Sequence, residues 1–264
     1  MFAGRTALIT GAASGIGAAT TRALHRHGAT RLVLVDRDGD ALDALSAGLG
    51  MADDQLETAA FDVGDAAAWA ALEARVAARF GGIDHLVAAA GTGHPMAPVA
   101  ELSIEEWRRT LAANLDGAFL ALQAGIRLIR ARARGGAIVL LSSSTAFRAQ
   151  PGMAGYAVSK SALVQLTRTA AAEVAADNIR VNAIAPGIVE TPLFRGLTAF
   201  RDLAEKMGSE AEAFRVMAAR SVPIGRATKA DETAEQILFL LGQWGETITG
   251  AVLNADGGMT LTAA

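Results

Sequence analysis

The chain has 264 residues, a formal net charge of -3 and no cysteine. A hydrophobic fraction of 52% excludes a disordered chain, and the lack of cysteine excludes a disulfide framework and a thiolate metal site. The mild acidity excludes a basic surface for nucleic acid or anionic membrane. Since no apolar run reaches membrane-spanning length and no leader-like segment opens the chain, we expect a cytoplasmic protein.

Strand-like and helix-like segments alternate along the chain, as judged from short apolar runs and from apolar residues at helical spacing. The first half predicts strands at Arg5–Thr10, Arg31–Asp36, Leu56–Phe61 and Ile83–Ala89, with helices at Gly15–His27, Asp38–Gly48 and Ala66–Phe80. The second half predicts a long helix from Ser103 to about Arg132, a strand at Ala137–Leu141, a helix at Gly155–Ala176 and a strand at Ile179–Ile184. Two short amphipathic pieces follow at Leu193–Met207 and Glu210–Arg220, then a helix at Asp231–Leu241 and a strand at Ala251–Asn254.

This alternation predicts one α/β domain over residues 1–264, a Rossmann-type doubly wound parallel sheet of about seven strands with helices on both faces. Ligands of such sheets bind at the carboxyl ends of the strands. Residues 189–220 are expected to form a substrate lid, and ordered packing helices are the alternative.

A glycine-rich loop follows the first strand. Thr10–Gly17 has the spacing G-x-x-x-G-x-G and opens a helix, where small residues let a pyrophosphate approach backbone N–H groups. A tight turn that needs glycine for steric reasons is the alternative.

Two acidic residues end the second and third strands. Asp36 comes about 20 residues after the loop, where a carboxylate accepts hydrogen bonds from an adenosine ribose and repels a 2′-phosphate. NAD is therefore favoured over NADP, although the neighbouring Arg37 can pair with that phosphate. Asp62 is expected either near the adenine amino group or as a cap for the helix after Val63.

The only tyrosine of the chain, Tyr156, lies four residues before Lys160, one of three lysines. That spacing puts both side chains on one face of a helix. A nearby ammonium group lowers the pKa of a phenol from about 10, which makes a general acid/base near neutral pH. A contact on a helix surface is the alternative. The serine-rich strand end at Ser142–Ser144 should reach the same edge of the sheet as the glycine loop, which favours the catalytic interpretation.

Six motifs in order make the chain similar to the short-chain dehydrogenase/reductase family. They are Thr10–Gly17 (T-G-x-x-x-G-I-G), Asn114, Ser143 at thirteen residues before Tyr156, Tyr156–Lys160 (Y-x-x-S-K), Asn182–Gly187 with Thr191-Pro192, and Asp256–Gly258 (D-G-G). The family's N-N-A-G segment is here Ala88–Gly91. Losing its two asparagines is expected to remove hydrogen bonds between the central sheet and the cofactor loop, but not the chemistry.

The resemblance implies a role for each matching residue. Tyr156 exchanges the proton of the substrate, Ser143 binds the same oxygen, and Lys160 lowers the pKa of Tyr156 and binds the nicotinamide ribose. Asn114 holds a water that relays protons to solvent, while Thr191 and the Ile188 backbone orient the carboxamide. The full set expected to contact the cofactor is Gly11, Ser14, Gly15, Ile16, Gly17, Asp36, Arg37, Asp62, Val63, Ala90, Gly91, Asn114, Tyr156, Lys160, Pro186, Gly187, Ile188, Val189 and Thr191.

The substrate pocket is expected between residues 92–99, 144–153 and 189–220. Its predicted contacts are His94, Ser143, Phe147, Met153, Tyr156, Leu193 and Phe194, with Phe200 and Met207 nearby. A mainly apolar pocket favours a neutral alicyclic or aromatic secondary alcohol or ketone. Arg148 and Arg195 leave an acid or an acyl thioester open.

The favoured function is an NAD-dependent dehydrogenase of secondary alcohols that also reduces ketones. The alternatives are an NADPH-dependent 3-oxoacyl-thioester reductase, against which Asp36 argues, a non-enzymatic dinucleotide sensor and a methyltransferase. The last two have no use for Ser143, Tyr156 and Lys160 together. The resemblance also implies a homo-oligomer, a tetramer or a dimer, with the Asn114 and Tyr156 helices at one interface and the C-terminal segment at another. No metal is expected.

Overall fold

The structure is a computed structural model that describes residues 1–93 and 96–261. Seven parallel strands form its main sheet in the order β3-β2-β1-β4-β5-β6-β9. The strands are β1 (Thr6–Thr10), β2 (Arg31–Asp36), β3 (Leu56–Ala60), β4 (His85–Ala88), β5 (Gly136–Leu141), β6 (Ile179–Pro186) and β9 (Val252–Ala255). The predicted doubly wound sheet of about seven strands is confirmed.

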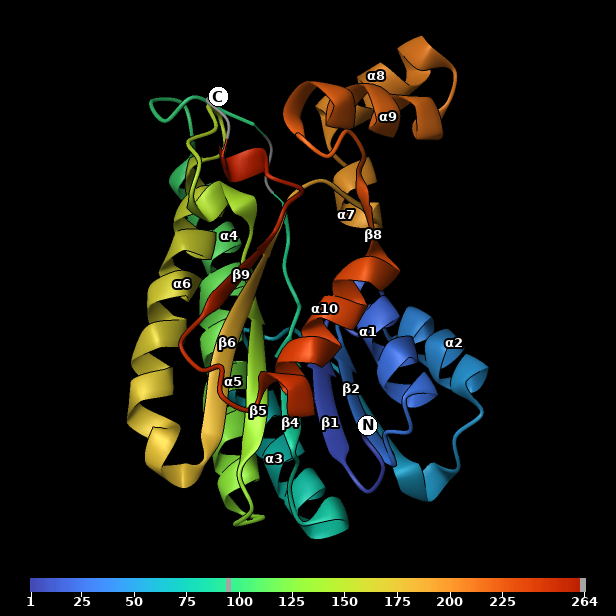
Figure 1. Cartoon of the computed structure of the whole chain (residues 1–264), viewed down its shortest axis with the longest axis vertical. Coiled ribbons are helices and arrows are strands. Elements are labelled where there is room, and N and C mark those ends of the chain that lie inside the picture. Colours follow the sequence, from blue (N-terminus) through green and yellow to red (C-terminus); the bar gives the residue numbers. More distant parts are fainter. Residues whose placement is uncertain (94–95, 262–264) are drawn as a thin grey trace.

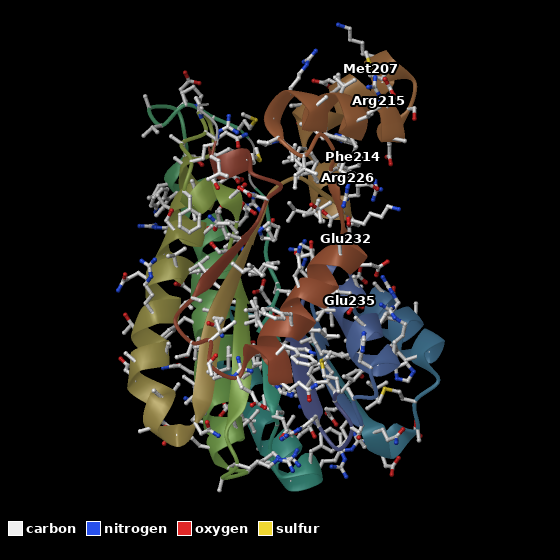
Figure 2. All side chains as sticks on the ribbon, viewed as in Figure 1. Met207, Phe214, Arg215, Arg226, Glu232 and Glu235 are labelled. Atoms are coloured by element: carbon white, nitrogen blue, oxygen red, sulfur yellow. The ribbon has the colours of Figure 1, made fainter. Side chains whose placement is uncertain are left out.

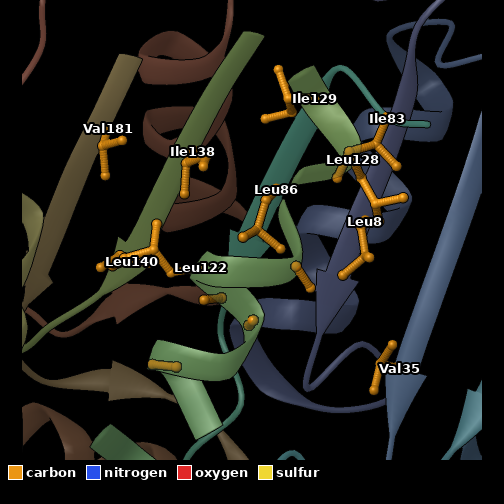
Figure 3. Close-up of a cluster of buried hydrophobic side chains, with 14 of the residues drawn as sticks. Leu8, Val35, Ile83, Leu86, Leu122, Leu128, Ile129, Ile138, Leu140 and Val181 are labelled. Atoms are coloured by element: carbon orange, nitrogen blue, oxygen red, sulfur yellow. The ribbon is translucent and has the colours of Figure 1, made fainter. Parts of the chain in front are cut away.

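Helices cover both faces of this sheet (Figure 1). One face packs against α3 (Ala66–Phe80), α5 (Gly117–Arg130) and α6 (Ala154–Val174), and the other against α1 (Gly15–Arg26), α2 (Gly39–Leu49) and α10 (Ala230–Leu241). Alternate side chains of each strand enter opposite cores: Val33 and Val35 of β2 join the first, Leu32 and Leu34 the second. Figure 3 shows part of the first core, in which Leu86 of β4 lies among Leu122 and Leu128 of α5. The sheet is thereby buried on both faces, and its strand ends stay available for a site.

The long helix predicted from Ser103 to Arg132 is interrupted. It begins as predicted, because the Ser103 hydroxyl accepts a hydrogen bond from the Glu106 N–H at 3.1 Å. After α4 (Ile104–Leu111), however, residues Ala112–Asp116 form a π-helical turn, in which the Gly117 N–H reaches back to the Ala112 carbonyl, before α5 begins. Such a turn inserts an extra residue into the helix and turns Asn114 inward, where it is fully buried.

Beyond β6 the chain leaves the sheet and builds a small separate cluster. It comprises β7 (Val189–Glu190), α7 (Pro192–Arg195), α8 (Thr198–Met207), α9 (Glu210–Ser221) and β8 (Thr228–Lys229). The piece predicted at Leu193–Met207 is thus two helices, and the pairing of β7 with β8 was not predicted. Phe194, Phe200 and Phe214 pack together at its centre in edge-on and tilted contacts, with the ring centroids of Phe200 and Phe214 4.4 Å apart. Figure 1 shows α8 and α9 extending beyond the carboxyl ends of the strands.

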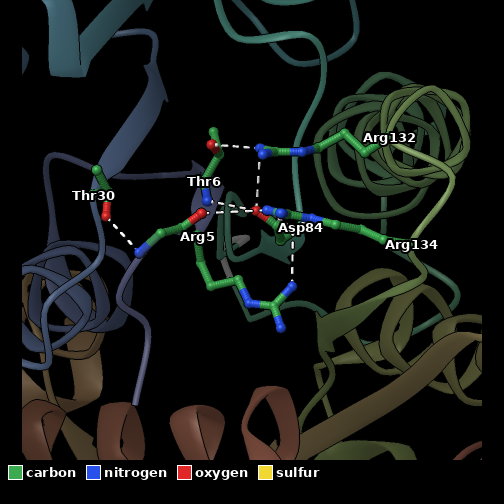
Figure 4. A network of polar contacts seen from close by, with 7 residues as sticks. Arg5, Thr6, Thr30, Asp84, Arg132 and Arg134 are labelled. Atoms are coloured by element: carbon green, nitrogen blue, oxygen red, sulfur yellow. Dashed lines mark hydrogen bonds and ion pairs between the residues drawn. The ribbon is translucent and has the colours of Figure 1, made fainter.

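A buried carboxylate ties the opposite edge of the sheet together (Figure 4). Asp84, which is 0% exposed, precedes β4 and accepts the Thr6 N–H at 2.7 Å and the Arg134 Nε–H at 2.7 Å. Arg5 and Arg132 complete the cluster, each at 3.2 Å. Burial acts to raise the pKa of Asp84, but the Thr6 hydrogen bond and the guanidinium groups outweigh it and lower the pKa overall. This cluster holds the amino ends of β1 and β4 in register.

Of the described residues, none belongs to a helix long and apolar enough to cross a membrane.

Candidate active site

The central strands β1 and β4 are neighbours, and the chain leaves them toward opposite sides of the sheet. This is the topological switch point at which doubly wound sheets bind ligands. Thr10–Gly17 follows β1 and Ala88–Gly91 follows β4, so both segments meet at the carboxyl edge. The strand order therefore brings together the two segments that were predicted to hold a cofactor.

The glycine loop is shaped by two close approaches. Gly11 has a φ of +64°, and a Cβ there would lie 2.9 Å from the Ala90 Cα. A Cβ at Gly17 would overlap the carbonyl group of Gly11. The steric need for glycine is therefore real at both positions, and it leaves a surface free of side chains. That surface fits the close approach of a pyrophosphate.

The first turn of α1 is open to an anion. Ser14 stands at its N-cap position in extended conformation, but its side chain makes no capping hydrogen bond. No acidic residue occupies the first turn either, which spans Gly15, Ile16 and Gly17. The uncapped N–H groups and the helix dipole suit a phosphate group. This fits the expected cofactor on grounds that are independent of the motif.

Asp36 connects the second strand to the glycine loop. Its Oδ2 accepts the Ala13 N–H at 3.0 Å and its Oδ1 accepts the Asp38 N–H at 3.1 Å. Each oxygen keeps a further lone pair, which is what a ribose diol would need. Arg37 is exposed and has no ion-pair partner in the part of the chain that the structure describes.

The other acidic candidate, Asp62, belongs to a turn. Its Oδ1 accepts the Gly64 N–H at 2.9 Å, whereas Asp65 caps α3 through the N–H groups of Ala67 and Ala68. Asp62 therefore does not cap the helix, which was one of its two expected roles. The cap is Asp65, three residues later. The second oxygen of Asp62 makes no hydrogen bond within the described residues. The neighbouring Val63 is buried, and its carbonyl accepts the Trp69 indole N–H at 2.8 Å.

The expected loss of hydrogen bonds at Ala88–Gly91 is partly offset. The Ala90 N–H donates to the Thr10 hydroxyl at 3.1 Å, which links the ends of β4 and β1 directly. The adjacent Gly91 lies over the catalytic candidates: a Cβ there would be 3.1 Å from Asn114 Oδ1 and 3.5 Å from Lys160 Nζ. A side chain at position 91 would therefore crowd Asn114 and Lys160.

Ser143, Tyr156 and Lys160 come together where β5 meets α6. The Ser143 hydroxyl, which accepts the Thr145 N–H at 3.3 Å, is close enough to the Tyr156 phenol to favour its charged form. Lys160 is 3% exposed, and its Nζ lies 5.7 Å from the centroid of the Tyr156 ring. Two hydrogen bonds connect α6 to the end of β5. Lys160 Nζ donates to the Leu141 carbonyl, and Ser142 Oγ donates to the Lys160 carbonyl, both at 2.8 Å. The role of Ser142 was not predicted from the sequence, because nothing in the motif distinguishes it from Ser143.

The charges of this pair are set by burial. Burial lowers the pKa of Lys160 to about 8. Burial also raises the pKa of Tyr156, and the hydrogen bond from Ser143 offsets only part of that effect. The expectation that Lys160 brings the pKa of Tyr156 below its ordinary value is therefore wrong for the chain alone. The ammonium group is turned to the Leu141 carbonyl, and desolvation dominates.

Asn114 uses its carboxamide within the protein. Its Oδ1 accepts the Thr92 N–H at 2.7 Å, and its Nδ2 donates to the Thr92 carbonyl at 2.9 Å and to the Ser159 hydroxyl at 3.3 Å. Ser159 Oγ in turn donates to the Tyr156 carbonyl at 2.7 Å. The side chain thus fixes the loop after Gly91 to the helix that carries Tyr156. A water bound by Asn114 would have to use other atoms of the residue, since both amide hydrogens are engaged.

The segment after β6 closes the site from the side. Pro186 ends β6, and a Cβ at Gly187 would lie 3.0 Å from the Asp256 Cα, so these chains touch. Ile188 and Val189 are buried, and the Ile188 carbonyl accepts the Thr228 N–H at 2.9 Å. The N–H of Ile188 has no acceptor among the described residues, so it is available to a ligand.

Thr191 reaches the glycine loop. A Cβ on Gly15 would lie 3.4 Å from the Thr191 Cβ. The Thr191 hydroxyl donates to the Val189 carbonyl at 3.3 Å and accepts the Phe194 N–H at 3.4 Å, which caps α7. Asn182, by contrast, is structural, since its carboxamide binds the Ile248 carbonyl and the Ala251 N–H.

The predicted substrate residues lie in different surroundings. Phe147 and Leu193 are exposed, and Met153 is buried just before α6. Phe194 and Phe200 belong to the aromatic cluster of the segment beyond β6, and Arg195 pairs with Glu210 at 2.8 Å. His94 lies outside the described residues. Figure 2 shows Met207 and Phe214 on that segment, beyond the Arg226–Glu232 ion pair. A hollow of about 290 Å³ beside that pair and β9 contains none of the four catalytic candidates.

Comparison with known proteins agrees with this geometry. Residues 11–260 match the family model described as enoyl-(acyl carrier protein) reductase. The chain is 40% identical to a cis-4-hydroxycyclohexanecarboxylate dehydrogenase of Sinomonas cyclohexanicum, over 98% of both chains. It is also 40% identical to a D-threitol dehydrogenase of Mycolicibacterium smegmatis, over 98% of this chain and 94% of that one.

The fold matches solved structures equally well. A carveol dehydrogenase of Mycobacterium avium in complex with NAD superposes with a TM-score of 0.91, at 26% identity, covering 98% of this chain and 99% of that one. The sheet, the motif order and these relatives agree. The chain therefore belongs to the short-chain dehydrogenase/reductase family of NAD(P)-dependent oxidoreductases, which act on the CH–OH groups of alcohols and the corresponding ketones.

Proposed function

We propose that the protein is an NAD-dependent dehydrogenase of secondary alcohols, and a ketone reductase in the reverse direction, with Tyr156 as the general acid/base. One observation carries this proposal: Ser143, Tyr156 and Lys160 meet at the carboxyl edge of the sheet, beside the glycine loop. A dinucleotide sensor or a methyltransferase has no need for such a trio. The two relatives named as dehydrogenases of hydroxylated compounds support the same reaction class.

The chain's own residues divide the work between them. In oxidation the Tyr156 oxygen takes the proton of the substrate hydroxyl, and in reduction it returns that proton to the carbonyl oxygen. Ser143 donates a hydrogen bond to the same oxygen, because its hydroxyl already faces the phenol. When bound, the nicotinamide would supply the hydride chemistry, as acceptor in oxidation and as donor in reduction. Lys160 supplies a positive charge beside the phenol, and its pKa of about 8 lets it lose and regain a proton near neutral pH.

The acidic residue at the end of β2 supports NAD over NADP. Asp36 accepts the N–H of Ala13 from the glycine loop and the N–H of Asp38, and a carboxylate at this strand end repels a 2′-phosphate. Arg37 is unpaired in the described structure and offers a partial counter-charge. A direct comparison of NAD and NADPH affinities separates this proposal from an NADPH-dependent 3-oxoacyl-thioester reductase. Tighter binding of NADPH would favour the reductase.

Replacing Tyr156 by Phe tests the proton transfer. The substitution keeps the ring and removes the hydroxyl, so kcat/KM for a secondary alcohol is expected to fall by about 10²–10⁴-fold. The reaction is followed as NADH absorbance over a panel of alcohols. A thermal-shift measurement with NAD shows that the variant still folds and binds cofactor. Turnover at the wild-type rate in Tyr156→Phe would show that the assigned role is wrong.

A further inference from the structure

Arg148, in the segment that joins the short turn Ser144–Ala146 to α6, is in an unusual position for an arginine. It is half-buried, yet among the residues that the structure describes it makes no hydrogen bond, ion pair or ring contact. The other half-buried arginines each contact a carboxylate, a carbonyl group or an aromatic ring: Arg5, Arg31, Arg132, Arg180 and Arg195. A partly desolvated guanidinium without a counter-ion is costly, and an anionic ligand would remove that cost.

Arg148 is held close to the catalytic serine. The Ser143 carbonyl accepts the Ala146 N–H at 3.0 Å, which folds the chain into one tight turn directly before Arg148. With about 2 Å of rise per residue in such a turn, the two Cα atoms are within about 12 Å of each other. Ser161 of α6 holds the turn through the Ala146 carbonyl at 3.2 Å. Arg148 therefore follows directly after a turn that begins at Ser143 and is anchored to α6.

Much of the chain around Ser143 carries no acidic residue. Residues 85–100 and residues 117–172, which include β4, α5, β5 and most of α6, contain no Asp or Glu. Lys160 is buried on α6, and Arg148 follows the turn that begins at Ser143. An anionic substrate would meet these two positive charges in a partly desolvated setting, where a charge pair is screened less than on the surface.

We propose that Arg148 binds a carboxylate of the substrate, so that the preferred substrates are alicyclic secondary alcohols, or the matching ketones, that carry an acid group. This inference rests on the proposed function and narrows its substrate class. Arg195 does not fill the role, because Glu210 neutralises it at 2.8 Å and the Phe214 ring covers it at 5.5 Å. The exposed apolar side chains of Phe147 and Leu193 suit the carbon ring between the two polar ends.

A matched pair of substrates isolates the charge. 4-Hydroxycyclohexanecarboxylate and its methyl ester differ little in shape, and their ratio of kcat/KM reports the recognition of the carboxylate. The wild type is expected to prefer the acid about 10-fold or more, mainly through KM. Arg148→Gln is expected to lower the ratio about 10–100-fold, which is the range for a charge-assisted hydrogen bond, and Arg148→Lys to lower it less. Raising the ionic strength should reduce the wild-type ratio.

Two further arginine variants serve as controls. Arg168 is exposed and unpartnered on α6 within the described chain, so Arg168→Gln removes the same charge and is expected to leave the ratio within about two-fold. Arg195→Gln tests the other arginine of the region. A ratio that falls in Arg195→Gln but not in Arg148→Gln would overturn the assignment, and so would a wild type that prefers the ester.

A binding measurement separates this inference from the proposed function. Cyclohexanecarboxylate has no hydroxyl group, so its affinity for the NAD-loaded enzyme, measured by calorimetry, needs no turnover. The affinity is expected to fall about 10–100-fold in Arg148→Gln. Binding through Arg148 without oxidation of either alcohol would refute the proposed function and uphold the carboxylate site. If the alcohols are oxidised but Arg148→Gln changes neither the kcat/KM ratio nor the affinity for cyclohexanecarboxylate, the proposed function stands and the carboxylate site is refuted.

Discussion

The phenol of Tyr156 sits between two opposing influences. Burial disfavours its charged form and raises its pKa, whereas the Ser143 hydroxyl stabilises the phenolate and lowers it. Lys160, the nearest cation, donates to the Leu141 carbonyl and has a pKa of about 8, again because of burial. The surroundings of Tyr156 and Lys160 therefore shift the pKa values of both residues away from their ordinary values.

Because Tyr156 is the only tyrosine, its titration can be read without interference. We expect the phenolate difference spectrum of the cofactor-free protein to have a midpoint above the ordinary value of about 10. Ser143→Ala should raise the midpoint further, because it removes the hydrogen bond that favours the charged form. NAD, whose oxidised ring is cationic, should lower it. A midpoint near 10 in the NAD-bound protein would count against the mechanism.

We expect Ser142 to position Tyr156 and Lys160 through the backbone of α6. Its hydroxyl donates to the Lys160 carbonyl at 2.8 Å, and the next residue, Ser143, favours the charged form of Tyr156. Ser142→Ala is expected to lower kcat about 3–10-fold, the equivalent of one net hydrogen bond, and to raise the Tyr156 midpoint as the Ser143 contact loosens. Ser142→Thr keeps a hydroxyl, so it should recover part of the lost kcat and reverse part of the shift in the Tyr156 midpoint.

The matched control for this prediction is Ser161→Ala. Ser161 lies on the same helix and also donates to a backbone carbonyl, that of Ala146 at 3.2 Å, but it does not touch Lys160. This variant should leave the Tyr156 midpoint unchanged. Equal shifts in the two alanine variants would mean that the helix responds as a whole and that Ser142 has no special role.

Among the elements, the sequence predicted those whose signals are local. Buried strands such as β2 were placed to the residue, because a continuous apolar run reflects burial on both faces. The π-helical turn at Asn114 was missed, because it depends on partners 22 and 45 residues away, Thr92 and Ser159. The same limit applies to the site: the spacing of Tyr156 and Lys160 is local, whereas the burial that sets their pKa values depends on the folded chain.

Asp84 joins β1 and β4, which are far apart in sequence. We expect its loss to lower the stability of the fold and to leave the reaction chemistry unaffected. Asp84→Asn leaves three guanidinium groups without their buried partner and is expected to cost about 3–5 kcal/mol in the free energy of unfolding. Since the pKa of Asp84 is lowered in the folded state, its contribution is present above about pH 4 and is lost as the pH falls through the folded value.

Denaturant unfolding as a function of pH checks this directly. The gap in stability between the wild type and Asp84→Asn should be widest near neutral pH and should narrow in acid. A gap that is constant with pH would show that the carboxylate charge is not what holds β1 to β4.

At the scale of the whole molecule, two separate faces carry exposed apolar side chains. Phe119 of α5 and Val158 of α6 are 43% and 45% exposed, and they lie on the helices that also carry the site. Phe239 of α10 and Trp244 just after it are 41% and 67% exposed, next to the C-terminal strand β9. Large exposed apolar groups in clusters mark interaction surfaces. The family resemblance predicts one interface on the helices of Asn114 and Tyr156 and another on the C-terminal segment, and we expect these exposed side chains to lie in them.

Two independent faces on one chain predict a closed tetramer that can be dismantled one interface at a time. In sedimentation experiments the wild type is expected to have a molecular mass about four times the 27.1 kDa of one chain. Phe119→Glu and Trp244→Glu should each yield dimers, and the double variant monomers, because a buried unpaired carboxylate is too costly for either interface. Val99→Glu, which alters an exposed apolar residue outside both faces, should remain tetrameric.

The assembly should also affect activity. Since α6 carries both Val158 and Tyr156, Phe119→Glu should lower kcat, whereas Trp244→Glu should affect it less. A wild type that is monomeric at micromolar concentration would refute the predicted tetramer. If only one of the two substitutions changes the molecular mass, the protein has one interface and is a dimer.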